Sequence, residues 1–156
     1  MRTLSVYLDT SVFGGVFDEE FEAPSRAFFD LVSAGRFSLL VSDVTRQEIA
    51  FAPNPVQAHF DKMLASMRLV PVEERVLVLR DAYVAAGIVT EKWADDAAHV
   101  AAATVAEADL IVSWNFRHIV HFDKIRLYNA VNAMRGYRLL EIRSPLEVID
   151  YEDEDL

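Results

Sequence analysis

The chain has 156 residues, of which 53% are hydrophobic, and it contains no cysteine. This length and composition suit one globular domain with a full core and exclude a disordered chain. The lack of cysteine excludes disulfides, zinc–thiolate sites and a cysteine nucleophile, and it fits a reducing cytoplasm, where we expect the protein to work. No apolar run approaches the roughly 20 residues that span a bilayer, and the N-terminus does not resemble a secretory signal, so we expect no membrane partner.

The net charge of −10 argues at first against a nucleic-acid partner, but the charges are unevenly distributed along the chain. The last ten residues carry six acidic side chains and no basic one, so we assign residues 1–148 to a single domain and residues 149–156 to an acidic tail. Residues 110–146 carry six Lys and Arg side chains against two acidic ones. A carboxylate cluster that binds cations would account for part of the remaining negative charge.

A strand that ends in a carboxylate is predicted near the start of the chain. Residues 4–8 contain one polar residue, Ser5, and such a nearly continuous apolar run suits a strand covered on both faces, as in a parallel sheet. Asp9 follows at once, and in open α/β sheets the functional site lies outside the carboxyl ends of the strands. Two interpretations remain open for Asp9: it holds a metal or acts as a nucleophile, or it only caps the next helix.

Short strands and helices alternate along the rest of the chain. Apolar runs bounded by Gly, Pro and Asp predict further strands over residues 37–41, 69–72, 109–113 and 138–142. Apolar periodicity and capping residues predict helices over residues 11–17, 24–34, 44–51, 56–67, 73–86, 92–106 and 125–134. This alternation predicts an α/β fold with a mostly parallel central sheet.

Three acidic residues fall where a parallel sheet can bring them together. Asp9 ends the first strand, Glu48 lies on the helix after the second strand, and Asp96 lies near the start of the helix that leads to the fourth strand. That helix is rich in alanine, so it can approach the sheet closely and bring Asp96 to the strand ends; a plain core helix with acids at its N-terminus is the alternative. Two or three carboxylates with open positions suit a hard divalent cation such as Mg²⁺.

Four segments carry a resemblance to a known family: residues 7–11 (YLDTS), 42–49 (SDVTRQEI), 96–103 (DAAHVAAA) and 108–116 (ADLIVSWNF). In their order and spacing the sequence resembles the PIN domain, in particular the single-domain VapC-like toxin ribonucleases, from about residue 6 to residue 148. The resemblance implies a three-layer α/β/α sandwich and an endonuclease that acts on RNA with Mg²⁺ or Mn²⁺.

The resemblance also implies roles for particular residues. By position, Asp9, Glu48 and Asp96 match the first three acidic residues of the family, which would hold the metal. The fourth acid of the family usually follows the fourth strand, and Asn115 occupies that place here, as it does in a subgroup of PIN proteins. An amide can ligate a metal through its carbonyl oxygen or orient a water, but it brings no charge, which puts a second metal site in doubt.

The residues beside this set are open to more than one interpretation. Thr10 and Ser11 either hydrogen-bond a metal-bound water or the scissile phosphate, or they cap the following helix. Arg117 is the best candidate for contact with a substrate phosphate. We expect His118 in a solvated loop, with contact to a substrate phosphate as the alternative. We expect His99 to be a buried helix residue that bonds a backbone group, with metal ligation as the alternative.

The function that these residues and the resemblance imply is a metal-dependent endoribonuclease, the toxin of a type II toxin–antitoxin pair. A metal-bound water would attack the phosphorus in line and leave a 3′-hydroxyl and a 5′-phosphate. The resemblance further implies a cognate antitoxin protein and a homodimer. Two alternatives stay open: a degenerate PIN-fold binding or adaptor protein without nuclease activity, which Asn115 and the net charge favour, and a haloacid-dehalogenase-like phosphatase, which needs an Asp where this chain has Ser11.

Overall fold

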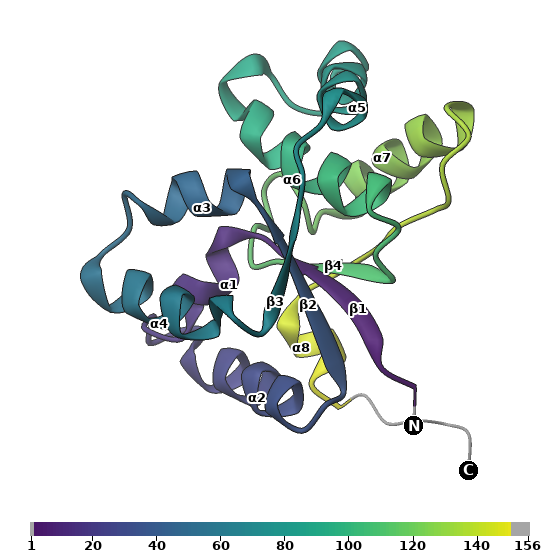
Figure 1. The fold of residues 1–156 in the computed structure, drawn as a ribbon. Coiled ribbons are helices and arrows are strands. Elements are labelled where there is room, and N and C mark those ends of the chain that lie inside the picture. Colours follow the sequence, from purple (N-terminus) through teal and green to yellow (C-terminus); the bar gives the residue numbers. More distant parts are fainter. Residues whose placement is uncertain (1, 151–156) are drawn as a thin grey trace.

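A five-stranded, entirely parallel sheet lies at the centre of the protein (Figure 1). The computed structural model describes residues 2–150. The strands are β1 (Leu4–Leu8), β2 (Phe37–Ser42), β3 (Met67–Val70), β4 (Leu110–Val112) and β5 (Glu141–Arg143), and they lie in the order β3-β2-β1-β4-β5. Because β1 is the central strand, β2 and β4 flank it, and the ends of all three meet at one edge of the sheet.

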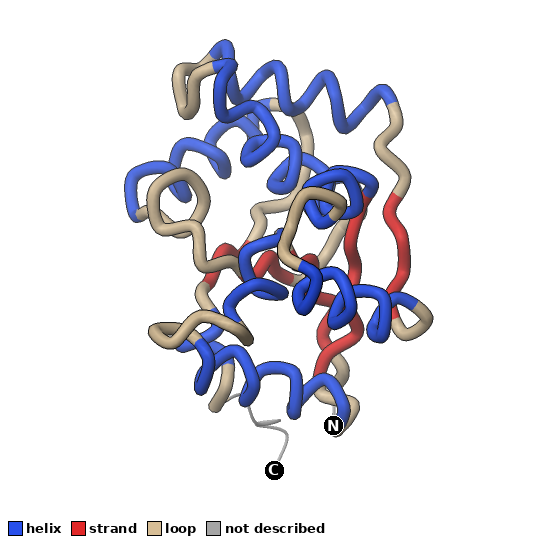
Figure 2. The backbone as a smooth tube through the Cα atoms, turned by 90° about the vertical axis from the view of Figure 1, so that its left-hand side faces the viewer, coloured by secondary structure: helices blue, strands red, loops and turns tan. Residues whose placement is uncertain are grey.

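Helices cover both faces of the sheet, as the views in Figures 1 and 2 show. One face packs against α1 (Thr10–Gly15), α2 (Glu22–Ser33), α4 (Asn54–Leu64) and α8 (Pro145–Val148). The other face packs against α5 (Glu74–Ala85), α6 (Ala94–Val105) and α7 (Phe122–Met134). This arrangement confirms the predicted α/β/α sandwich.

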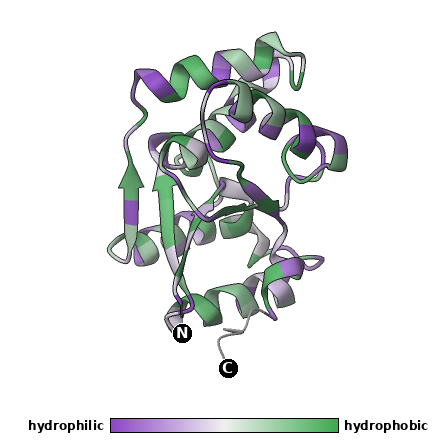
Figure 3. Ribbon diagram, turned by 90° about the vertical axis from the view of Figure 1, so that its right-hand side faces the viewer, coloured by the Kyte–Doolittle hydropathy of each residue, from purple (hydrophilic) through white to green (hydrophobic). Residues whose placement is uncertain are grey.

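Two hydrophobic cores lie on the two faces, and the alternation of β1 divides its side chains between them. Val6 and Leu8 belong to the core under α1, α2 and α4, whereas Tyr7 belongs to the core under α5, α6 and α7. All three side chains are fully buried. The strands at the centre of the sheet are accordingly hydrophobic over most of their length (Figure 3).

Helix α6 is the most alanine-rich element and is buried along nearly its whole length. Every residue from 97 to 104 is buried, and the helix packs against α5, β2 and β4. A short 3₁₀ turn, η1 (Glu91–Trp93), precedes it. The small side chains allow this close approach, so Asp96 and His99 in the first turns of α6 lie near the carboxyl edge of the sheet.

Helix α3 (Asp43–Ile49) starts directly at the end of β2 because its first turn is capped. Ser42 and Thr45 form a reciprocal capping box, in which the Ser42 hydroxyl accepts a hydrogen bond from the Val44 N–H at 3.2 Å. The cap fixes the direction in which α3 leaves the sheet. It thereby fixes the position of Glu48 in the last turn of the helix.

The element boundaries differ in places from those predicted. Strand β3 begins at Met67, two residues earlier than expected, because Met67 pairs with Leu39 of β2. Helix α7 begins at Phe122, and the predicted helix over residues 92–106 is divided into η1 and α6. The predicted tail over residues 149–156 falls, beyond Asp150, outside the described residues. Over residues 2–150, no helix has both the length and the apolar character needed to cross a membrane.

Candidate active site

Asp9 lies at the end of the central strand and is almost completely buried, with 4% of its surface exposed. It occupies the N-cap position of α1, but its carboxylate accepts no hydrogen bond from the helix backbone, so the capping interpretation fails. The Ser11 hydroxyl donates to Asp9 Oδ1 at 2.7 Å, and Ser11 in turn accepts from the Trp114 N–H at 2.8 Å. Burial raises the pKa of Asp9 to about 6, against the opposing effects of His99, Ser11 and Ser113.

Glu48 reaches the same edge of the sheet from the last turn of α3. The Thr10 hydroxyl donates to Glu48 Oε1 at 2.7 Å, and His99 Nε2 lies 2.5 Å from the same oxygen. Burial acts to raise the pKa of Glu48, but the hydrogen bond and charge of His99 and the bond from Thr10 outweigh it and leave the pKa below its usual value. The Glu48 side chain is about one-third exposed, with 33% of its surface accessible.

His99 is a buried helix residue as predicted, with 1% of its surface exposed, but both of its ring nitrogens bond side chains, so the prediction that it bonds a backbone group is wrong. Its Nδ1 lies 2.8 Å from Tyr7 Oη, and Tyr7 Oη lies 2.7 Å from Ser42 Oγ. The physical reason is the close approach of α6 to β1, which places the Tyr7 hydroxyl against the imidazole. Burial alone would lower the pKa of His99, but Tyr7, Glu48 and Asp9 together raise it well above its usual value.

Asp96 lies in the first turn of α6 and is half-buried. Burial raises its pKa, and a hydrogen bond from the Asn115 side chain partly opposes that effect. The Asn115 carbonyl oxygen accepts the His118 N–H at 2.9 Å, so the amide nitrogen serves Asp96. In this structure Asn115 therefore turns its amide nitrogen towards Asp96 and its carbonyl oxygen into its own loop.

Glu48 lies close enough to the other two predicted acids, Asp9 and Asp96, to influence both of them. The charge of Glu48 acts to raise the pKa of both Asp9 and Asp96, and the charge of His99 acts to lower both. Within residues 2–150, however, no three His, Asp or Glu side chains are already disposed around a common metal position. The donors themselves fit Mg²⁺ or Mn²⁺, because they are carboxylate oxygens and because the burial of Asp9 leaves its negative charge short of compensation.

A group of cationic and aromatic side chains lies beside the acids, on η1 and on the loop after β4. Around the Trp93 ring, the Arg117 guanidinium is 5.3 Å, the Lys92 ammonium 5.1 Å and the His118 ring 4.9 Å from its centroid. His118 is buried, so the prediction of a solvated loop position is wrong; Trp93 and the loop cover it. Lys124 Nζ lies 3.2 Å from His118 Nδ1, and burial, Lys124 and Arg117 lower the pKa of His118.

Trp114 fixes the loop that carries Asn115 and Arg117. Its ring stacks on Phe21 at 4.2 Å between centroids, and its Nε1 donates to Ser25 Oγ at 2.9 Å. A Cβ atom at Gly15 would lie 2.5 Å from Ser25 Oγ and 2.7 Å from Trp114 Nε1. The glycine therefore makes room for this contact.

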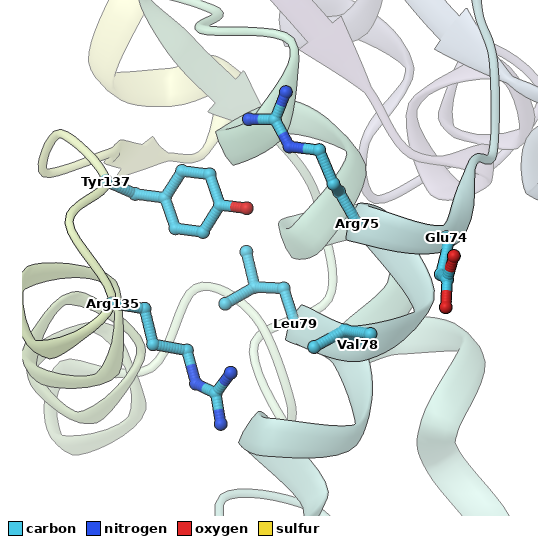
Figure 4. Close-up of a pocket in the computed structure, with 6 residues that line it drawn as sticks. All are labelled: Glu74, Arg75, Val78, Leu79, Arg135 and Tyr137. Atoms are coloured by element: carbon cyan, nitrogen blue, oxygen red, sulfur yellow. The ribbon is translucent and has the colours of Figure 1, made fainter.

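A pocket lies between α5 and the turn after α7 (Figure 4). Its volume is about 270 Å³, and Arg75 and Arg135 flank the apolar surface of Leu79 and Tyr137. The Arg75 guanidinium lies 5.7 Å from the centroid of the Tyr137 ring. None of the residues predicted for the site lines this pocket.

The fold and the acids define an α/β protein with a carboxylate cluster at the carboxyl edge of a parallel sheet. Residues 5–117, more than half of the chain, match the family model for the PIN domain, and the chain belongs to the PIN domain family. The matched region contains Asp9, Glu48, Asp96 and Asn115. Membership of this family excludes the alternative of a haloacid-dehalogenase-like phosphatase.

Comparison with solved structures gives the same fold. The chain is similar to a chain in the crystal structure of VapBC2 from Rickettsia felis bound to a DNA fragment from their promoter. The TM-score is 0.58, with 11% sequence identity, over 90% of this chain and 98% of that chain. No curated protein matches the sequence significantly.

Proposed function

We propose that this protein is a Mg²⁺- or Mn²⁺-dependent endoribonuclease and the toxin of a type II toxin–antitoxin pair. The observation that carries the proposal is the convergence of Asp9, Glu48 and Asp96 at the carboxyl edge of the sheet. Burying carboxylates next to one another is unfavourable unless a cation compensates them. The proposal therefore gives this arrangement a reason that fold stability alone does not.

The side chains divide into metal ligands and groups that hold them. Asp9, Asp96 and Glu48 would hold the metal, which when bound supplies a nucleophilic water and neutralises charge on the phosphodiester. Thr10 and Ser11 commit their hydroxyl protons to Glu48 and Asp9, so we assign them to positioning these carboxylates. This assignment differs from both interpretations that the sequence left open, which were contact with a metal-bound water or the scissile phosphate and capping of the helix.

Arg117 is the residue we propose for contact with an RNA phosphate. Its guanidinium is exposed, and it lies over Trp93 with Lys92 nearby. The loop that carries Arg117 also carries Asn115, which bonds Asp96, so a phosphate held there would lie beside the acids. The cationic side of the site explains how a protein of net charge −10 can still bind RNA.

The biological part of the proposal draws on the relatives. Membership of the PIN domain family and likeness to a chain of VapBC2 support a toxin with a cognate antitoxin protein, and a homodimer follows by the same analogy. We place the protein in the cytoplasm, where its RNA substrate is found.

RNA cleavage by the purified protein tests the proposal. We expect cleavage with Mg²⁺ or Mn²⁺, loss of cleavage with EDTA, and fragments that carry a 5′-phosphate and a 3′-hydroxyl. Glu48→Gln and Asp96→Asn should each abolish it, whereas Asp109→Asn, an acid that bonds Ser5 at the opposite end of β1, should cleave like wild type after its folding has been checked. Cleavage that persists in EDTA would contradict the proposal.

A second candidate is a PIN-fold protein that binds RNA or a partner without cutting it. The orientation of Asn115 favours it, because the carbonyl oxygen that could complete a metal site accepts the His118 N–H. The two candidates predict different results for Asn115→Asp. A binding protein would gain cleavage from this substitution, whereas an active nuclease cuts RNA before it.

A further inference from the structure

We infer that His99 and Tyr7 are positioning residues that hold one oxygen of Glu48 and leave its other oxygen for the metal. The inference rests on the proposed function and adds to it, because it concerns two residues outside the acidic set. It is carried by a chain of buried hydrogen bonds that starts in the core and ends at the site.

The chain of hydrogen bonds is continuous from the backbone of α3 to the Glu48 carboxylate. The Val44 N–H donates to Ser42 Oγ at 3.2 Å, Ser42 Oγ lies 2.7 Å from Tyr7 Oη, and Tyr7 Oη lies 2.8 Å from His99 Nδ1. His99 Nε2 then meets Glu48 Oε1 at 2.5 Å. Among the described residues, the hydrogen bonds to the Glu48 carboxylate both use Oε1.

The proton on His99 Nε2 follows from its partners. A carboxylate oxygen accepts only, so Nε2 must carry the proton that it shares with Glu48. With a neutral imidazole, Nδ1 accepts from the Tyr7 hydroxyl; with an imidazolium, Nδ1 donates to Tyr7, which then donates to Ser42. Both arrangements keep the same donor, His99 Nε2, on Glu48. The positioning role therefore does not depend on the charge of His99.

The members of this chain lie next to the acids in the sequence. Tyr7 is two residues before Asp9, His99 is three residues after Asp96, and Ser42 caps the helix that carries Glu48. The network thus ties together β1, α3 and α6, the three elements that bring the acids to the site. These hydrogen bonds hold β1, α3 and α6 in fixed positions relative to one another beside the carboxylates.

Core stability alone gives no reason for this network. Tyr7, Ser42 and His99 are each at most 1% exposed, and burying such polar groups costs free energy unless they are hydrogen-bonded. Apolar side chains of similar volume would fill the space without that cost. The network ends on the carboxylate of Glu48, whose side chain is partly exposed. The residue that the network positions is therefore one at the candidate site.

Tyr7→Phe is the test, because it removes one hydroxyl and keeps the ring. The matched control is Tyr83→Phe, which loses an equally buried hydroxyl that bonds Thr104 and Asn132 instead. We expect Tyr7→Phe to weaken Mn²⁺ binding, measured by electron paramagnetic resonance on the protein without RNA, by about 10-fold, near the lower end of the effects of outer-shell partners. The kcat for RNA should fall similarly while KM changes less than about twofold, and Tyr83→Phe should leave all three values unchanged.

A second pair of variants separates positioning from packing. His99→Gln retains a donor that can reach Glu48, whereas His99→Leu removes it, so the Gln variant should recover part of the Mn²⁺ affinity that the Leu variant loses. Circular dichroism and thermal melting establish that each variant is folded. Equal Mn²⁺ affinity and equal kcat in Tyr7→Phe and Tyr83→Phe would overturn the inference while leaving the nuclease in place. A wild-type protein that neither binds Mn²⁺ nor cuts RNA would overturn the proposed function itself, and this inference with it.

Discussion

Asp9→Asn should stabilise the metal-free protein, although it removes a metal ligand. Burial raises the pKa of Asp9 from 3.8 to about 6, so the folded state favours the protonated carboxyl and is destabilised by the ionised one. Above pH 7 the carboxylate is ionised in both states, and a shift of about 2 units then corresponds to roughly 3 kcal/mol of lost stability. The amide is isosteric and neutral, and its oxygen can still accept the Ser11 hydroxyl.

The sign of the pH dependence is fixed by the direction of the shift. Because the pKa of Asp9 is raised in the folded state, the contribution of its protonated carboxyl to the free energy of unfolding is fully present below about pH 4. That contribution is lost as the pH rises through 6. Asp9→Asn should therefore increase the free energy of unfolding by well under 1 kcal/mol near pH 4 and by about 3 kcal/mol at pH 8. For a domain of this size, the gain at pH 8 raises Tm by roughly 6–12 °C.

Thermal and urea unfolding of both proteins in EDTA, at pH 4, 6 and 8, measures this difference. Because other titrating groups are present in both proteins, the difference between their unfolding free energies reports on Asp9. Adding Mn²⁺ should reduce this difference, because the metal stabilises the wild type alone. A variant that is less stable than wild type at pH 8, or a stability difference that does not change with pH, would refute the reasoning from burial.

Three other substitutions test separate parts of the site. Gly15→Ala should destabilise the protein by roughly 1–3 kcal/mol in urea unfolding, because its Cβ would overlap Trp114 and Ser25. Arg117→Ala should reduce the slope of RNA affinity against salt by about 0.7, measured with Ca²⁺ in place of Mg²⁺. Asn115→Asp should lower Tm in EDTA by placing a like charge against Asp96, and Mn²⁺ should raise Tm more than in wild type.

The controls for these substitutions come from the same chain. Gly14 is the neighbour of Gly15 on α1, and a Cβ there meets nothing within 4 Å, so Gly14→Ala should be neutral or stabilising. Arg26 is paired with Glu22 on α2, and Arg26→Ala should leave the salt slope unchanged. Equal unfolding free energies for the two glycine variants would show that Trp114 and Ser25 have room to move. Equal salt slopes for the two arginine variants would remove Arg117 from the RNA-binding site.

The sequence was sufficient for the sheet and for the carboxylates because both follow from local pattern. An apolar run that ends in Asp9 predicts a buried parallel strand with an acid at its carboxyl end, and parallel strands bring such ends to one edge. Glu48 and Asp96 were found in the same way, from their places on helices next to predicted strands. In the structure Glu48 lies close enough to both Asp9 and Asp96 for its charge to raise their pKa values, and the role of the three residues as metal ligands stays a prediction.

The contacts between side chains could not be predicted, because they join residues far apart in the sequence. His99 is 51 residues from Glu48 and 92 from Tyr7, and only the depth to which α6 packs on the sheet brings the three together. The available signals were the spacing of His99 from Asp96 and the hydroxyl of Tyr7 in a largely apolar strand. The direction of the Asn115 amide depends on the His118 N–H of its own loop, which a residue type does not reveal.

Cleavage of RNA by wild type and Asp9→Asn, side by side with Mn²⁺ at pH 8, is the most direct test of the account. Since Asp9→Asn is expected to be the more stable protein in the absence of metal, its inactivity cannot be attributed to unfolding. The account predicts metal-dependent cleavage by wild type and none by the folded variant. Equal cleavage by both proteins, or none by folded wild type with either metal, would contradict it.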